Sequence, residues 1–202
     1  LGGTLTLGGV SETASTTAGS VPWTYSVANS ATQYLAAGQI ASEVFTVTIT
    51  DVNGATVTQD VTITITGTND TPTITSVTEI TNVVGAVIED GSLSTLTDTG
   101  TITFDDIDLT NTHSALAAPA SGNTLGGTLA LSNFNEDATT TAGTVTWTYS
   151  VANSATQYLA AGQIASEVFT VTITDVNGAT VTQDVTVTIT GTNDTPTITS
   201  VT

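Results

Sequence analysis

Apolar and polar residues alternate along much of the chain. From Phe45 to Thr50, Phe, Val and Ile alternate with Thr, and a second alternating segment covers Ala55 to Gly67. The Asn53-Gly54 pair between them is a strong short-range signal for a β-hairpin. A period of two places apolar side chains on one face of a strand and Thr on the other. We therefore predict a hairpin over residues 42–67, with its apolar face toward a core and its Thr face toward water.

Similar but shorter patterns indicate further strands. They are expected at 4–7, 20–28, 73–75, 84–89, 99–104, 112–117, 125–131 and 144–152. Only residues 30–37, copied at 154–161, look helical, and we expect one turn there that ends before Gly38. Many short strands separated by turn residues are typical of a β-sandwich. The predicted fold class is all-β, of immunoglobulin or cadherin type.

The chain contains a long internal repeat. Residues 1–78 recur as residues 125–202 with ten differences, and residues 23–62 are identical to 147–186. A period of 124 residues is a whole domain rather than a solenoid repeat. Residues 67–72 and 191–196 resemble polar linkers.

We therefore predict tandem β-sandwich domains in an extended array. The expected parts are the C-terminal part of one repeat at 1–71, one complete repeat at 72–195 and the start of the next at 196–202. The chain would then belong to a longer periodic polypeptide. Whether strands of another chain complete residues 1–71 is left open at this point.

The charge of the chain is one-sided. It has 18 acidic residues, no Lys or Arg and a net charge of −18. Without cationic side chains it cannot neutralise phosphates, which excludes nucleic acids and anionic membrane surfaces as partners. No apolar run has the length of a membrane span, so no membrane insertion is expected. Cys is absent, which excludes disulfides. An apolar content of 39%, rich in Val and Ile, separates the chain from disordered acidic segments.

Three carboxylates crowd the end of one predicted strand. Asp105, Asp106 and Asp108 lie within four residues, and Asn111 follows. Two charges ~4 Å apart repel by ~4 kcal/mol at an effective dielectric constant near ~20. Ca²⁺ binds about six to eight oxygen atoms of carboxylates, amides and backbone carbonyls. We therefore predict a Ca²⁺ site, to which the linker residues Asn69 and Asp70 contribute; the alternative is a solvated acidic turn.

Other acidic groups have simpler alternative interpretations. Glu89-Asp90-Gly91 and the second linker pair, Asn193-Asp194, are also compatible with ordinary turns. Asp51 and Asp175 open the two Asn-Gly hairpins, and turn chemistry alone would explain them.

Catalysis is not expected. His113 is the only histidine, which argues against a Zn²⁺ site and against a Ser–His pair, so a structural or surface role is predicted for it. Trp23 and Trp147 each lie in a predicted strand, which favours the core over a carbohydrate-stacking platform. The carboxylates lie in turns and linkers without an aromatic cleft, which argues against glycoside hydrolysis. The chain is predicted not to be an enzyme.

The combination of segments resembles the VCBS repeat, which occurs in tandem in very large bacterial surface and RTX-type adhesins. The resemblance covers essentially the whole period. It rests on Leu125 to Leu129, Trp147-Thr148-Tyr149, Leu159 to Gln163, Glu167 to Asp175 and Thr190 to Asp194, and on Glu89-Asp90-Gly91, Gly100 to Phe104 and Asp106 to Leu109. The same segments are similar, more distantly, to a cadherin repeat.

The cadherin resemblance implies Ca²⁺ at the junctions between domains. It implies ligands from the linker, from the following domain and from the preceding domain: Asn69 and Asp70, then Asp106, Asp108, Asn111 and Asp175, and Glu43. Asp105 is a further candidate from the local acidic group alone. It assigns Glu89, Glu167, Asn193 and Asp194 to the next junction. The cadherin Asp-Arg-Glu motif is absent, and Leu35 to Gln39 stands near its place.

The resemblance to the VCBS repeat implies an extracellular, secreted protein of the bacterial cell surface. The predicted function is a stalk or spacer of an adhesin or surface fibre, rigidified by Ca²⁺ and supporting adhesion or biofilm formation. Its expected partners are neighbouring repeats of the same chain. Two alternatives are a subunit that assembles laterally with other copies into a filament or surface layer, and a carbohydrate-binding module that uses the variable segment 6–20.

Overall fold

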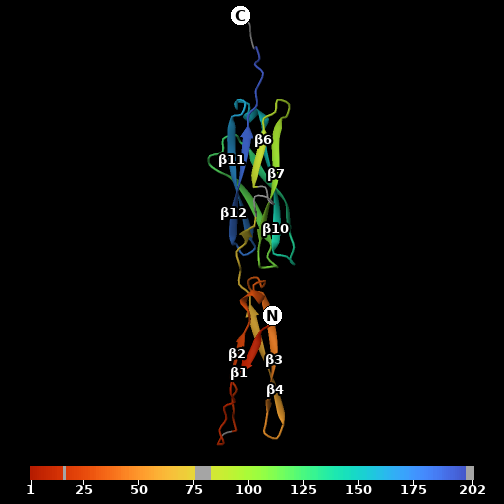
Figure 1. Cartoon of the computed structure of the whole chain (residues 1–202), viewed down its shortest axis with the longest axis vertical. Helices are drawn as coiled ribbons and strands as arrows, with labels where there is room; N and C mark the ends of the chain where they lie inside the picture. The colour runs from red at the N-terminus through yellow and green to blue at the C-terminus, as the bar shows by residue number, and fades with distance from the viewer. Residues whose placement is uncertain (16, 76–82, 199–202) are drawn as a thin grey trace. The chain divides into compact units, whose positions relative to one another are not determined.

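The computed structural model describes residues 1–15, 17–75 and 83–198 (Figure 1). The chain divides into two compact units, Leu1–Asn69 and Asp70–Thr202, which we call unit 1 and unit 2 and describe separately. The division falls slightly ahead of the expected boundary at 71/72, and residues 199–202 of the expected third repeat lie outside the described residues. No helix within the described ranges is long and apolar enough to cross a membrane.

Unit 2 contains two four-stranded sheets that form a sandwich. One has the strand order β5 (Thr73–Ile74), β7 (Thr95–Asp105), β10 (Ala142–Ala152), β9 (Thr128–Glu136). The other has the order β6 (Val84–Ile88), β12 (Thr180–Thr190), β11 (Ile164–Asp175), β8 (His113–Pro119). All neighbours are antiparallel except β6 and β12, which are parallel. The predicted all-β sandwich class is confirmed.

The alternation of apolar and polar residues determines what unit 2 buries. On β10 every second residue from Gly143 to Val151 is buried, and Trp147 and Tyr149 have no exposed surface. On β11 the buried positions include Val171 and Ile173, also without exposed surface. Burying one such apolar side chain contributes roughly 1.5–3 kcal/mol. Trp147 is therefore a core residue, as its position within a strand predicts.

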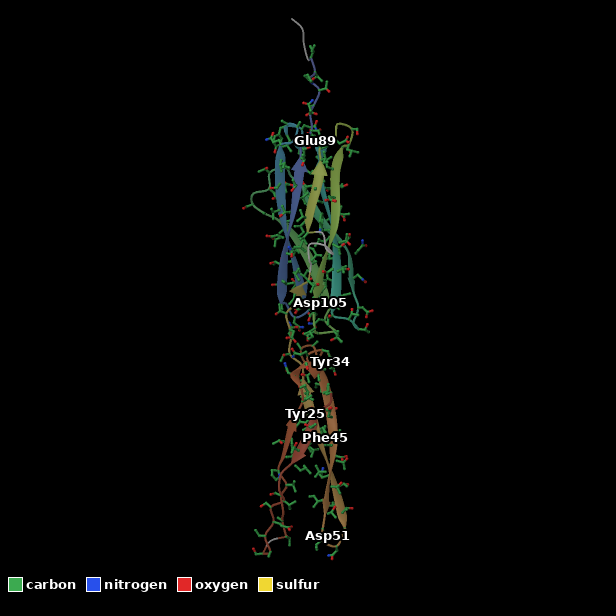
Figure 2. All side chains as sticks on the ribbon, viewed as in Figure 1. Tyr25, Tyr34, Phe45, Asp51, Glu89 and Asp105 are labelled. Atoms are coloured by element: carbon green, nitrogen blue, oxygen red, sulfur yellow. The ribbon has the colours of Figure 1, made fainter. Side chains whose placement is uncertain are left out.

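The described part of unit 1 contains two two-stranded sheets. β1 (Thr4–Leu7) pairs with β2 (Trp23–Ser26), and β3 (Ile40–Thr50) pairs with β4 (Thr56–Thr66), both antiparallel. The registers repeat those of unit 2, since Ile40 pairs with Thr66 as Ile164 pairs with Thr190. Tyr25 and Phe45 make an edge-to-face contact with ring centroids 5.9 Å apart (Figure 2). The predicted hairpin over 42–67 is confirmed in both copies.

The expected helical segment is shorter than its pattern. A single 3₁₀ turn, η1 (Asn29–Ala31), overlaps only the start of 30–37, and its copy η2 (Asn153–Ala155) overlaps the start of 154–161 in the same way. The Thr156 hydroxyl donates to the carbonyl of Asn153 at 2.8 Å, which closes the turn locally instead of extending it. The strand expected at 20–28 is likewise limited to β2, with one isolated bridge between Ser11 and Ser20 beyond it.

Candidate functional site

The acidic segment after β7 folds into a loop, residues 106–112, that leads into β8. The N–H of Asp108 donates to Oδ1 of Asp106 at 2.9 Å, an Asx-type turn. The N–H of Asn111 then donates to the carbonyl oxygen of Asp108 at 2.9 Å. These two turns direct Asp108 inward, so that only 1% of its surface is exposed.

Asp108 is a buried carboxylate with one unsatisfied oxygen. Its Oδ2 accepts the N–H of Asp70 at 2.8 Å and the Nδ2–H of Asn111 at 3.2 Å. Its Oδ1 is buried and has no hydrogen-bond partner in the described part of the chain. Burial raises the pKa of Asp108, as do the charges of Asp106, Asp70 and Asp175, against the lowering effect of the Asp70 N–H. A buried polar atom without a partner costs free energy, and a positive ion would remove that cost.

The β11–β12 hairpin brings a further carboxylate to this end of unit 2. Oδ1 of Asp175 accepts the N–H groups of Asn177 at 2.9 Å and Ala179 at 2.8 Å. Asp175 therefore stabilises the hairpin turn, the simpler role that its sequence position indicates. The amide of Asn177 donates to Oδ1 of Asn111 at 3.3 Å. The hairpin is thereby joined to the 106–112 loop. We call Asp70, Asp106, Asp108, Asn111 and Asp175 the Asp108 cluster.

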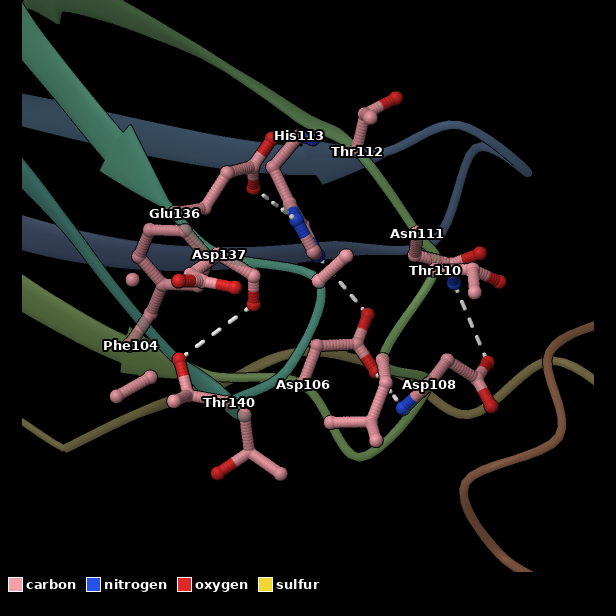
Figure 3. A pocket seen from close by; sticks show the side chains of 15 residues that line it. Phe104, Asp106, Asp108, Thr110, Asn111, Thr112, His113, Glu136, Asp137 and Thr140 are labelled. Carbon is pink, nitrogen blue, oxygen red and sulfur yellow. Dashed lines mark hydrogen bonds and ion pairs between the residues drawn. The ribbon is translucent and has the colours of Figure 1, made fainter.

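A cavity of about 280 Å³ lies beside the cluster (Figure 3). The ring of His113 is buried at its wall, with Nε2 2.9 Å from Oδ2 of Asp106 and Nδ1 2.8 Å from Oε2 of Glu136. The ring also packs against Phe104, with centroids 4.9 Å apart. His113 thus has a structural role, as predicted, with its ring held between two carboxylates.

Sequence reasoning missed Glu136 and Asn177 as neighbours of this cluster. Glu136 is the last residue of β9 and directly precedes Asp137, and no local sequence pattern marks it as a neighbour of His113. Asn177 belongs to an Asn-Gly pair, whose turn function hides any second role. Both contacts join segments far apart in the chain, which local patterns do not reveal.

The donor set of the Asp108 cluster is made of oxygen atoms, which suits Ca²⁺ rather than Zn²⁺. No three side chains of the types His, Cys, Asp and Glu form a group able to hold a metal ion by themselves within the described ranges. A Ca²⁺ site also draws on Asn, backbone carbonyl oxygens and water, so its ligands need not all be acidic. The observation that fits such an ion is the buried Oδ1 of Asp108, while Asn111 donates to the other oxygen, Oδ2.

Within unit 2, the structure places Glu167 apart from this cluster. The carboxylate of Glu167 is buried and accepts the N–H groups of Leu125 at 2.9 Å and Gly127 at 3.1 Å and the hydroxyl of Tyr149 at 2.8 Å. In unit 1, Glu43 accepts the hydroxyl of Tyr25 at 2.6 Å. Glu167 is eight residues from Asp175 on β11, or about 26 Å at ~3.3 Å per residue. Both glutamates therefore hold strands together inside their own units.

The remaining candidates of unit 2 divide between its two ends. Glu89 and Asp105 lie at opposite ends of the unit (Figure 2). Glu89 is buried and accepts the N–H of Thr192 at 2.9 Å. Thr192 directly precedes the exposed Asn193 and Asp194, so Glu89, Asn193 and Asp194 lie at the same end of unit 2. Asp105 is the last residue of β7, one position before Asp106, and is partly exposed. Asn69 is the last residue of unit 1.

Comparisons with known proteins give a limited result. No family model matches the chain, and no curated protein matches its sequence. Seven chains of solved structures match. One is the structure "Zebrafish RET Cadherin Like Domains 1 to 4", with a TM-score of 0.36 and 14% identity over 76% of this chain. The match covers 34% of the RET chain, so the present chain spans about a third of its length.

Proposed function

We propose that this chain is a structural spacer of an extracellular bacterial adhesin or surface fibre, in which Ca²⁺ stabilises tandem β-sandwich repeats. The observation that supports the proposal is the buried, unpartnered Oδ1 of Asp108 in a chain that lacks Lys and Arg. The sequence has no Lys or Arg side chain to neutralise the Asp108 cluster, and its one histidine, His113, lies between Asp106 and Glu136. A divalent cation is the simplest source of the missing positive charge.

The position of Asp70 gives the ion a mechanical role. Asp70 is the first residue of unit 2, and its N–H already donates to Asp108. An ion bound to Oδ1 of Asp108 fixes the 106–112 loop and the segment that begins at Asp70. The chain then loses freedom where one repeat follows another, and a string of repeats becomes stiffer. Near-identical repeats extend such a spacer without adding a new binding specificity.

The test is thermal unfolding of the full chain in Ca²⁺ and in EGTA. At a Ca²⁺ concentration about 100 times Kd, binding adds ~2.7 kcal/mol per site, which raises the melting temperature of unit 2 by several degrees. The Asp108→Asn chain should lose this response. In EGTA it should melt at or above the native temperature, because the buried charge is gone. Small-angle scattering on the same samples should show a more extended native chain in Ca²⁺.

Asp184→Asn is the matched control, because it removes the same charge from the exposed face of β12, where the Asp184 carboxylate accepts the hydroxyl of Thr170 at 2.7 Å. This chain should keep the full response to Ca²⁺. An equal response of the Asp108→Asn and native chains, or no response of either, would reject the calcium part of the proposal. An unchanged scattering profile would reject the stiffening.

A further inference from the structure

One face of unit 1 is exposed although its counterpart in unit 2 is buried. Trp23 is 46% exposed and its counterpart Trp147 is 0% exposed. Ile49 is 44% exposed and Ile173 is 0% exposed. These pairs belong to the stretch that is identical in the two copies, residues 23–62 and 147–186. The difference in burial therefore arises from what covers each copy and not from its own sequence.

The covering elements in unit 2 all come from the segment between the two copies. β10 pairs with β7, β11 pairs with β8 and β12 pairs with β6. In unit 1 the equivalent strands β2, β3 and β4 each have one hydrogen-bonded strand neighbour among the described residues. They present open edges as well as an apolar face. A groove of about 650 Å³, lined by Ile49 and Val57 among others, lies on this face.

We propose that the apolar face of unit 1 is a docking surface for a polypeptide segment of the same kind as residues 72–124. Such a segment supplies three strands that pair with β2, β3 and β4 in the registers of unit 2. It also supplies side chains equivalent to Ile102 and Phe104, which are buried in the core of unit 2. Within β2, β3 and β4 the receiving residues are identical to their counterparts in unit 2 except Ile63, which stands where unit 2 has Val187. The surface is therefore already shaped for such a segment.

A second copy of the 202-residue chain cannot supply a covering segment for every receiving face. Each chain contains two receiving parts, within 1–69 and 125–195, and a single covering segment, 72–124. Exchange of segments between copies therefore leaves one receiving face per chain uncovered. The occupant is an additional covering segment. Pairing of two unit 1 faces with each other is the competing outcome.

The experiment joins a second covering segment to the full chain. Residues 72–124 are placed directly before Leu1, because Leu125, the counterpart of Leu1, follows Thr124 directly. The emission of Trp23 is obtained by comparing each protein with its Trp23→Phe variant. In the extended chain Trp23 should shift to the blue and become as resistant to acrylamide quenching as Trp147. In the 202-residue chain it should remain open to acrylamide.

Two substitutions in the extended chain test the face itself. Ile49→Asp should return Trp23 to its exposed emission, because a charge then lies where Ile173 is buried in unit 2. Thr48→Asp, on the opposite face of β3, should leave Trp23 shielded. An exposed Trp23 in the extended chain would overturn the proposal. So would a 202-residue chain that sediments as a dimer with Trp23 already shielded, since the second copy would then be the occupant.

Discussion

At the scale of single residues, the two glutamate–tyrosine pairs show how the same motif behaves in two environments. Tyr149 and Tyr25 donate to Glu167 and Glu43, and the first pair is buried while the second is partly exposed. Burial, followed by the bond to Glu167, raises the pKa of Tyr149. In unit 1 the bond to Glu43 is the main cause and raises the pKa of Tyr25 to about 12. An added Cβ at Gly127 would overlap both Glu167 and Tyr149, so glycine allows this close approach.

We expect Tyr149→Phe to destabilise unit 2 by about 1–3 kcal/mol, because the buried Glu167 loses one donor. Urea unfolding followed by Trp147 fluorescence measures the change. The bond contributes below the ordinary tyrosine pKa near ~10 and is lost as the pH rises through the raised pKa of Tyr149. The difference between native and Tyr149→Phe chains should therefore persist at neutral pH and shrink in strong alkali. Tyr158→Phe, at a 63% exposed position, is the control and should have little effect.

At the scale of elements, local patterns predicted the strands better than the site. The Thr-rich alternation predicts both long hairpins, because a hairpin of this kind is specified locally by the period of two in each strand and by the Asn-Gly turn between them. The strand expected at 4–7 is β1, but the 20–28 strand is shorter because its outer part has only one bridge. In the candidate site, the local acidic motif that contains Asp106 and Asp108 is enough to predict Asp108 as a site residue. The positions of Glu136 and Glu167 depend on contacts between distant strands, which no local pattern encodes.

The β11–β12 hairpin depends on Gly178, which has φ 92° at the tip. A side chain is disfavoured in that conformation, so Gly178→Ala should cost about 1–2 kcal/mol. Urea unfolding of the full chain measures this loss in unit 2. Gly122→Ala is the matched control: an added Cβ there meets open space and its φ is not positive, so stability should stay the same or rise slightly. Equal effects of the two substitutions would show that the turn geometry at Gly178 is not required.

At the scale of the whole molecule, the same sequence, residues 23–62 and 147–186, is exposed on one face in unit 1 and buried on that face in unit 2. In the described part of unit 1 only Leu35 and Ala36 are buried, while unit 2 has a continuous core between its two sheets. Buried apolar area is the main source of folding free energy, so the two copies should differ in stability despite their near-identical sequences. The incomplete face, rather than the strand sequences, limits the stability of unit 1.

This difference is measurable by amide hydrogen exchange with mass spectrometry. Residues 40–50 of β3 and 164–174 of β11 have the same sequence, so their peptides have the same mass and give one signal. After exchange, the isotope envelope of that signal should split in two, since β11 is protected in a four-stranded sheet and β3 has a single partner strand. Peptides from residues 84–120, which occur once, should show a single envelope and act as the control. A single, slowly exchanging envelope for the shared peptide would mean that unit 1 is as well covered as unit 2, and that the exposed face is closed in solution.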